Sequence, residues 1–434
     1  MNNKGLNDNT LSDLPGIELD AEMAQRILDH GDRYSQQTAD LARFIHTYKS
    51  EFRETLLKQG LLQVAHADMK GFDIAAVDGA SAITSHGGGT LIAATAYKAS
   101  INDEKQRGAS EVILLPNSID IESFATLLRV HLELSLLASD KLDEDRLIIL
   151  DHSFWGVMQA VSRALASYKS QRSQVLQARQ NPDTDVMQLA WKNLFESCLD
   201  VEGSFFQMMR NKRVISLSKK GVSQYFVRLL SKAATINDSR AFTLASALND
   251  RALLRHVLLP GEYTRPESLY HIEQEESSIK SWKRSRFATS FEATDGPDPF
   301  KGREYVFDEY GLPRDDRQEI KGRRLFTTYY LPHEWSRVYR IEFHEPMLMQ
   351  TDAPFDPTGQ GKRFQRVLAS VKQSVRPETK EPLCQVLADI RSKVAGASAV
   401  STLPERTFYQ LRDLYRNNSE MLDIVDTLIK EERT

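Results

Sequence analysis

The sequence FDIAAVDGAS, residues 72–81, is a short and mostly apolar stretch that carries one carboxylate, Asp78, into a turn of small residues. A strand that is apolar on both faces is usually central in a sheet with helices packed above and below it. An acid at the end of such a strand stands where open α/β sheets keep their chemistry. We therefore predict an α/β fold in which this strand presents Asp78 to a functional site.

The same pattern occurs a second time in RLIILDHS, residues 146–153, where another apolar strand ends in Asp151. Hard divalent cations prefer carboxylate oxygens, so two acids presented by two core strands could hold a metal ion. Either aspartate alone is more often a turn residue, because Asp is common in turns for hydrogen-bonding reasons. Their repetition on one predicted sheet favours the metal site.

The elements around these two strands predict a fold class. The tight turn SHGGG at 85–89 is followed by an apolar run at 90–96, which indicates an antiparallel hairpin. A third strand is expected at 111–115, a helix at 119–138, and then the second acidic strand at 146–150. Three successive strands, a helix and a further strand form the opening order of the RNase H-like fold. We expect a mixed sheet flanked by helices.

The rest of the chain divides into three predicted regions. Residues 1–61 form an unstructured polar start followed by one or two long amphipathic helices. Residues 62–396 form the main domain, with a helical insertion at about 155–210 and an irregular excursion at about 262–320. Residues 397–434 form a helical tail that packs on the body or on a partner. The later elements expected are strands at 214–218, 325–331 and 338–343, and helices at 223–233, 238–256, 359–374, 381–394 and 404–432.

The composition is that of a soluble globular protein. Among 434 residues, 56 Lys and Arg stand against 60 Asp and Glu, so the net charge of −4 gives no global sign of nucleic-acid binding. The two cysteines are too few for a disulfide framework and form no CxxC motif. The polar N-terminus lacks the apolar core of a signal peptide, and no apolar run approaches the ~20 residues that span a bilayer. These features predict a cytoplasmic protein.

Two further acids are candidates for the same site. Glu133 lies in mostly apolar company on the helix 119–138, and a buried acid must be paired or bound to a metal. An ion pair with Arg129 on a solvated helix edge explains Glu133 equally well. Asp389 lies on the late helix, where a surface position is the simpler interpretation. His152 directly follows Asp151 and could approach a metal or a phosphate, but we favour a turn residue with no role.

A basic segment supplies a possible contact surface for DNA. Residues 203–237 contain no acidic residue but seven cations, and phosphate contacts need such a concentration. Tyr225 and Phe226 lie within it and could stack on a base, although core packing is more common. The cations are Arg210, Lys212, Arg213, Lys219, Lys220, Arg228 and Lys232.

The order and spacing of these motifs resemble the NurA nuclease family. The resemblance runs from about residue 20 to residue 396, and no single motif carries it alone. Ala80 stands where the first family motif has Ser, His152 where the second has Gly, and Asp389 where the late helix usually has His. The matching segments are VDGAS (77–81), Glu133, LDHS (150–153), VISLSK (214–219), NDRALL (249–254), LPGE (259–262), YRIEF (339–343) and PLCQVLAD (382–389).

This resemblance implies a homodimer with an RNase H-like fold that cleaves DNA with Mn²⁺ or Mg²⁺ and works with a hexameric HerA-type translocase ATPase. It also implies that Asp78, Glu133, Asp151 and Asp389 hold the metal and act in catalysis. Lys219 would contact the DNA backbone or the scissile phosphate, with Lys220 and Arg213 of the basic segment nearby. Tyr330, or its neighbour Tyr329, could line the DNA channel, although core packing explains these tyrosines equally well.

Two hypotheses for function follow. The first is a metal-dependent DNA nuclease that acts with a ring ATPase in DNA end processing or anti-phage defence. The second is a catalytically weak or inactive RNase H-like subunit that binds DNA or docks the translocase. The nuclease requires the carboxylates of Asp78, Glu133 and Asp151 to lie within a few Å of one point, since separations beyond ~8 Å cannot serve one or two adjacent metals.

Overall fold

The computed structural model describes residues 21–86, 89–101, 107–115, 121–138, 146–154, 156, 213–218, 223–233, 248–269, 305–307, 313–315, 325–348 and 356–430. Among these residues, no helix is both long and apolar enough to cross a membrane.

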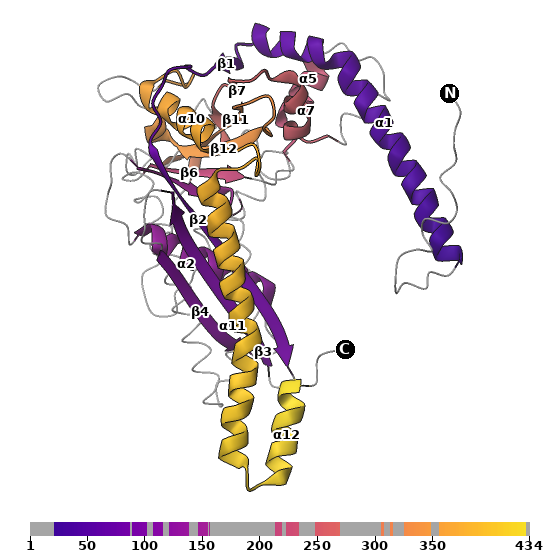
Figure 1. Ribbon diagram of the computed structural model, residues 1–434. Coiled ribbons are helices and arrows are strands. Elements are labelled where there is room, and N and C mark those ends of the chain that lie inside the picture. Colours follow the sequence, from indigo (N-terminus) through magenta and orange to yellow (C-terminus); the bar gives the residue numbers. More distant parts are fainter. Residues whose placement is uncertain are drawn as a thin grey trace.

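One mixed sheet organises the structure (Figure 1). Its strands β2, β5 and β6 run parallel to one another, and the other pairs are antiparallel. A separate two-stranded sheet joins β9 (Tyr305–Phe307) to β10 (Pro313–Asp315). The order across the main sheet is β1 (Leu62–Val64), β7 (Glu262–Thr264), β11 (Leu325–Leu331), β12 (Tyr339–His344), β6 (Arg213–Ser218), β5 (Arg146–Leu150), β2 (Asp73–His86), β3 (Gly89–Ser100) and β4 (Arg107–Leu115), with β8 (Glu267–Ser268) paired to β11.

The predicted RNase H-like opening is confirmed. Strands β2, β3 and β4 form an antiparallel meander, and the predicted turn joins β2 to β3 with Ser85 opposite Thr90. Helix α2 (Ile121–Ala138) then leads to β5, which returns beside β2 in parallel register. The prediction that Asp78 enters a turn at the end of its strand is wrong, because β2 continues through Gly79 and Ser81 to His86. The parallel pairing instead places the middle of β2, at Val77 and Asp78, beside the end of β5 at Leu150.

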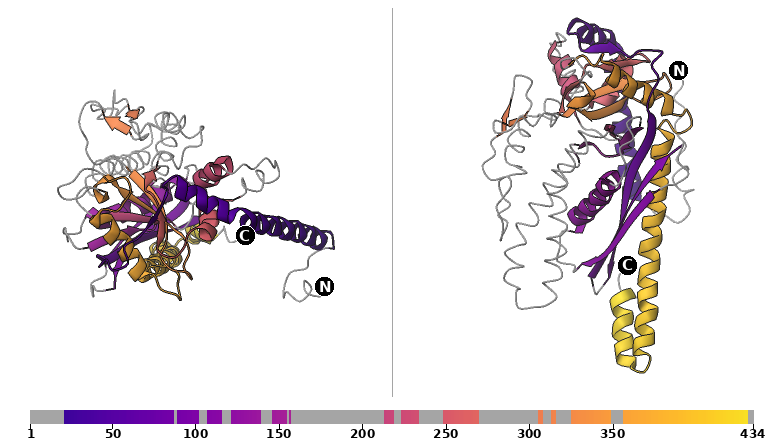
Figure 2. Two further views of the ribbon diagram at one scale, coloured as in Figure 1. Left: turned by 90° about the horizontal axis from the view of Figure 1, so that it is seen from above. Right: turned by 90° about the vertical axis from the view of Figure 1, so that its left-hand side faces the viewer.

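Helices cover both faces of the sheet. Helix α2 lies against one face of β2 and β3, and helix α11 (Leu383–Tyr415) crosses the other face (Figure 2). Under α2 the core contains Val77 and Ile92, packed with apolar side chains of the helix. Helix α10 (Lys362–Ser374) covers the face of β6, β11 and β12 with a second apolar cluster. The sheet is therefore buried on both sides where Asp78 lies beside the end of β5.

The N-terminal helix α1 (Ala21–Lys58) is a single long helix whose first half extends away from the body (Figure 1). Phe52 and Leu56, in its second half, pack with helices α5 (Tyr225–Ala233) and α7 (Asp250–Val257). Arg53 donates two hydrogen bonds of 2.6 Å to the carboxylate of Glu262, which fixes this half of α1 to β7.

Two predicted boundaries differ from the structure. The stretch predicted to be irregular from residue 262 begins with the strands β7 and β8, which are too short for a periodic pattern. The sequence predicts two helices, 381–394 and 404–432, with a break between them. This break is wrong, because α11 runs without interruption through Gly396 and Pro404. A Cβ at Gly396 would lie 3.5 Å from Thr95 Oγ1, so this glycine marks close packing on β3 rather than a helix end. Helix α12 (Ser419–Lys430) follows and packs back on α11 (Figure 1).

The buried carboxylate of Asp250 caps helix α5 from outside that helix. Its Oδ2 accepts hydrogen bonds from the Ser223 hydroxyl (2.8 Å) and the Tyr225 N–H (3.0 Å), and its Oδ1 accepts one from the Val227 N–H (3.0 Å). Burial raises the pKa of Asp250 to about 6, because desolvation of the charged form outweighs these hydrogen bonds.

We expect the substitution Asp250→Asn to change how stability depends on pH. The folded-state pKa of about 6 exceeds the usual value near 4, so folded Asp250 binds a proton that the unfolded chain has released. The stabilisation of the folded state by this bound proton is complete below pH 4 and is lost as the pH rises through 6. Relative to the variant, the wild type should lose about 2 kcal/mol of unfolding free energy between pH 4.5 and 7.5. Urea denaturation of both proteins measures this difference, and parallel pH curves contradict it.

Candidate active site

Asp78 lies at the point where β2 loses one neighbour. Pairing between β2 and β5 ends at Val77 and Leu150, whereas pairing between β2 and β3 continues to His86. Asp78 therefore lies where β2 has lost its pairing with β5 but keeps its pairing with β3, a position called the step in the sheet below. It lies between α2 and α11 and is only 2% exposed. Its Oδ1 accepts a hydrogen bond from the Gly79 N–H at 2.8 Å.

Glu133 reaches the same step from α2. The side chain is 1% exposed, as expected for an acid on the apolar face of a helix that covers a sheet. Gly79 provides the necessary space, since a Cβ at this position would lie 2.5 Å from Glu133 Oε1 and 2.7 Å from Arg129 Cγ. The absence of a side chain at residue 79 lets the Glu133 carboxylate lie directly beside β2.

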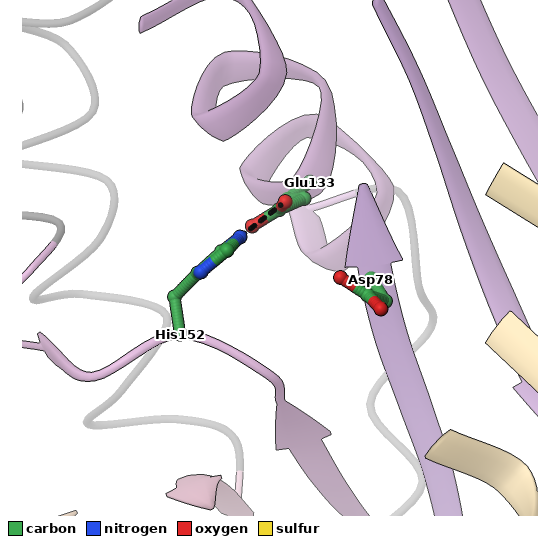
Figure 3. A group of neighbouring side chains, drawn as sticks. All are labelled: Asp78, Glu133 and His152. Carbon is green, nitrogen blue, oxygen red and sulfur yellow. Dashed lines mark hydrogen bonds and ion pairs between the residues drawn. The ribbon is translucent and has the colours of Figure 1, made fainter. Parts of the chain in front are cut away.

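The turn after β5 brings Asp151 and His152 to the site. The Asp151 N–H donates to the Val77 carbonyl at 3.4 Å, so the backbone still follows β2 after β5 ends. The Gln385 amide of α11 donates to Asp151 Oδ1. His152 Nε2 lies 3.0 Å from Glu133 Oε1, and Figure 3 shows its ring pointing at this carboxylate.

Asp389 completes the group from the opposite face of the sheet. It lies one helical turn after Gln385 on α11 and is partly exposed. Lys393, a further turn along, places its ammonium 2.8 Å from Asp389 Oδ1. The sequence favours a surface position for Asp389. In the structure its side chain is neither fully exposed nor fully buried.

These side chains form two groups that share Asp78. Asp78, Glu133 and His152 make the first group, and Asp78, Asp151 and Asp389 make the second. Within each group, the potential ligand atoms all lie within 4.8 Å of one another. Carboxylate oxygens and an imidazole nitrogen are ordinary ligands for divalent metals. The side chains present therefore fit a divalent metal.

A family comparison identifies the chain. The model of the NurA domain matches residues 72–374. The chain belongs to the NurA family. No curated protein matches significantly. Among solved structures, the NurA nuclease from Sulfolobus solfataricus has a TM-score of 0.50 and 11% sequence identity, covering 89% of this chain and 97% of that one. A NurA structure with manganese has a TM-score of 0.40 and 11% identity, covering 80% of this chain and 92% of that one.

Charges in this NurA site are paired closely. The Glu133 carboxylate raises the pKa of His152, and burial of the ring opposes this effect. Arg129 Nε lies 3.8 Å from Glu133 Oε1, so the ion pair considered as an alternative explanation of Glu133 is present, although it is longer than a hydrogen bond. Glu133 therefore faces Arg129, His152 and Asp78 at the same time, which an ion pair on a solvated helix edge does not explain.

The residues predicted to bind DNA lie outside this cluster or outside the described part of the chain. Lys219 and Lys220 belong to the residues that are not described. Arg213 begins β6, and its guanidinium lies 4.4 Å from the ring centre of Phe72. Tyr330 is 0% exposed within the core cluster between the sheet and α10, so DNA cannot reach it in this structure. Tyr225 and Phe226 pack edge to face at 5.1 Å, in the core rather than on a base-stacking surface.

Two residues beside the acids have weaker signals in the sequence. The structure places His152 against Glu133, and its position directly after Asp151 is the signal that it could reach the same point. Gln385 contacts Asp151 from α11. Its signal was the spacing of four residues before Asp389, which places both side chains on one face of a helix.

Proposed function

We propose that this protein is a divalent-metal-dependent DNA nuclease that hydrolyses phosphodiester bonds with Mn²⁺ or Mg²⁺. The observation that supports the proposal best is the pair of ligand groups that share Asp78, in a chain of the NurA family. The similar structure from Sulfolobus solfataricus is itself named as a nuclease. Asp78 has a ligand atom within 4.8 Å of Glu133 in one group and of Asp151 in the other, and this spacing supports one or two adjacent metals.

Four carboxylates would hold the metal, namely those of Asp78, Glu133, Asp151 and Asp389. When bound, such a metal lowers the pKa of a water molecule and stabilises negative charge on a phosphate oxygen. The Gln385 amide orients Asp151 by donating a hydrogen bond to Oδ1. The Gly79 N–H orients Asp78 in the same way. Both contacts fix carboxylates before substrate binds, which reduces the cost of reorganisation.

The DNA backbone would be bound by cations near the end of β6. Lys219 and Lys220 directly follow this strand, which pairs with β5 next to the site. Arg213 lies at the other end of the same strand and would contact DNA further from the scissile phosphate. Phosphate contacts of this kind position the substrate without reading its sequence.

The resemblance to the NurA family also supports a homodimer in the cytoplasm that works with a hexameric HerA-type translocase ATPase. In this assembly the ATPase would feed DNA to the nuclease during DNA end processing or anti-phage defence. Light scattering of the purified protein measures the dimer. Co-purification with the HerA-type protein of the same cell tests the partnership, and two separately eluting proteins contradict it.

The decisive test is cleavage of end-labelled linear DNA with Mn²⁺, with Mg²⁺ and with EDTA. Wild-type protein should cleave only with a divalent metal, and Asp151→Asn should lower the rate by at least about 10³-fold, because the variant loses a charged ligand. Asp68→Asn, at an exposed turn, is the control and should cleave normally. A wild type that binds DNA without cleaving it supports the inactive DNA-binding subunit instead. Normal cleavage by Asp151→Asn contradicts the ligand role.

A further inference from the structure

We propose that His152 is a metal ligand and that it makes the position formed with Asp78 and Glu133 selective for transition-metal ions over Mg²⁺. The inference rests on the proposed function, because it assigns a donor and a preference within the same site. The two ligand groups differ in chemistry, since the group of Asp78, Asp151 and Asp389 offers only carboxylate oxygens.

The first step of the argument is that His152 is held in place from both sides. Ser216 of β6 donates a hydrogen bond to the His152 carbonyl. Two residues later, the Phe154 N–H donates to Glu342 Oε2 of β12 at 2.6 Å. These contacts fix the turn backbone to two neighbouring strands. The backbone that carries the His152 ring is therefore anchored to the sheet.

The second step is the distance between donor atoms. His152 Nε2 and Glu133 Oε1 are 3.0 Å apart. Two ligands at right angles, each about 2.1 Å from a common ion, are separated by about 3.0 Å. The present spacing therefore matches the separation of two neighbouring ligands of one metal. Figure 3 shows Asp78 on the strand beside this pair, and its ligand atom lies within 4.8 Å of both.

The third step is the preference of an imidazole. Mg²⁺ binds oxygen donors and retains several waters, whereas imidazole nitrogen suits first-row transition metals. A position with one nitrogen and two carboxylates should therefore bind Mn²⁺ or Co²⁺ more tightly than Mg²⁺. The all-carboxylate group should discriminate less between these ions.

The competing role for His152 is a simple ion pair with Glu133, which neutralises a buried carboxylate and never touches a metal. Both roles give the same contact in the metal-free protein. They differ in the Mn²⁺-loaded protein, because only a coordinated imidazole places a ¹⁴N nucleus beside the unpaired electrons of the ion.

Pulsed electron paramagnetic resonance of the Mn²⁺-loaded full-length protein detects this ¹⁴N coupling directly. We expect the coupling in the wild type and in His30→Gln, whose histidine lies exposed on α1. The coupling should be absent in His152→Gln and in His152→Asp. Calorimetry should show at least about a tenfold loss of Mn²⁺ affinity in His152→Gln, with Mg²⁺ affinity changed less than about threefold.

The variant His152→Asp separates loss of a nitrogen donor from loss of the site. It replaces the imidazole by an oxygen ligand, so it should still bind metal, lack the ¹⁴N signal and shift its preference toward Mg²⁺. A wild type that binds Mn²⁺ and cleaves DNA without ¹⁴N coupling overturns the role of His152 and leaves the nuclease intact. Coupling that persists in both variants also overturns it. A wild type that neither binds Mn²⁺ nor cleaves DNA overturns the proposed function as well.

Discussion

Asp78→Asn should abolish DNA cleavage and at the same time stabilise the metal-free protein. Asp78 belongs to both ligand groups, so its loss affects every metal position of the site. We expect cleavage to fall by at least about 10³-fold, which corresponds to about 4 kcal/mol in the activation barrier. Asn retains the shape of the side chain and an oxygen that can accept the Gly79 N–H.

The stability change has a separate physical cause. Without metal, the Asp78 carboxylate is repelled by those of Glu133, Asp151 and Asp389, each of which has an oxygen within 4.8 Å of it. Removing one negative charge relieves this repulsion and should raise the melting temperature of the metal-free protein. Added Mn²⁺ should stabilise the wild type but not the variant, because a ligand stabilises only the protein that binds it.

Thermal melting with and without Mn²⁺ measures both effects. Asp73→Asn is the matched control, since Asp73 begins the same strand and pairs with Arg146 at 3.2 Å away from the ligand groups. This control should cleave DNA and respond to Mn²⁺ like the wild type. A melting temperature of Asp78→Asn that still rises with Mn²⁺ contradicts the assignment of Asp78 as the shared ligand.

Gly79→Ala should disable the site through a single added methyl group. The new Cβ would meet Glu133 Oε1 at 2.5 Å, Arg129 Cγ at 2.7 Å and the Thr95 carbonyl at 3.0 Å. The side chains of α2 can move aside, but the Thr95 backbone of β3 cannot do so easily. We therefore expect Glu133 to be displaced, with cleavage reduced about 10²-fold, as for a misplacement of about 1 Å. The cost in stability should be about 1–3 kcal/mol, typical of overpacking.

Gly31→Ala provides the comparison for this substitution. Gly31 lies on the exposed part of α1, and a Cβ there has nothing within 4 Å. Ala is the better helix former, so this variant should be as stable as the wild type or more stable by up to about 1 kcal/mol. Urea denaturation and the DNA cleavage assay distinguish the two variants. Equal activity of Gly79→Ala and Gly31→Ala would show that Glu133 does not need its present position.

The sequence was sufficient for the elements whose signals are local. The apolar runs of β2 and β5 and the glycine turn between β2 and β3 determine the hairpin and its parallel neighbour. The strands β7 and β8 were missed because two or three residues carry no periodicity and depend on β11 for their partners. The continuity of α11 was missed because Gly396 normally signals a helix end, whereas here it permits contact with β3.

The candidate site could be predicted where the type of residue and its local sequence pattern indicate a metal ligand. Acids that follow apolar runs and one acid on an apolar helix face predict Asp78, Asp151 and Glu133 as candidates, and the structure places Asp78 near each of the other two. The direction of the His152 ring was not predictable, because Ser216 and Glu342, on strands distant in sequence, fix that turn. The burial of Tyr330 could not be predicted from the sequence either. A strand with one face in solvent and a strand covered on both faces can have the same tyrosines in their sequences.

Helix α11 joins the late part of the chain to a strand formed near its start. During synthesis, β2, α2 and β5 emerge from the ribosome well before α11 and can pair before the later elements exist. Asp389 and Gln385 arrive only with α11, so the second ligand group and the contact that orients Asp151 are absent from every shorter nascent chain. The order of synthesis thus delays assembly of the complete centre until the first turns of α11 have been made.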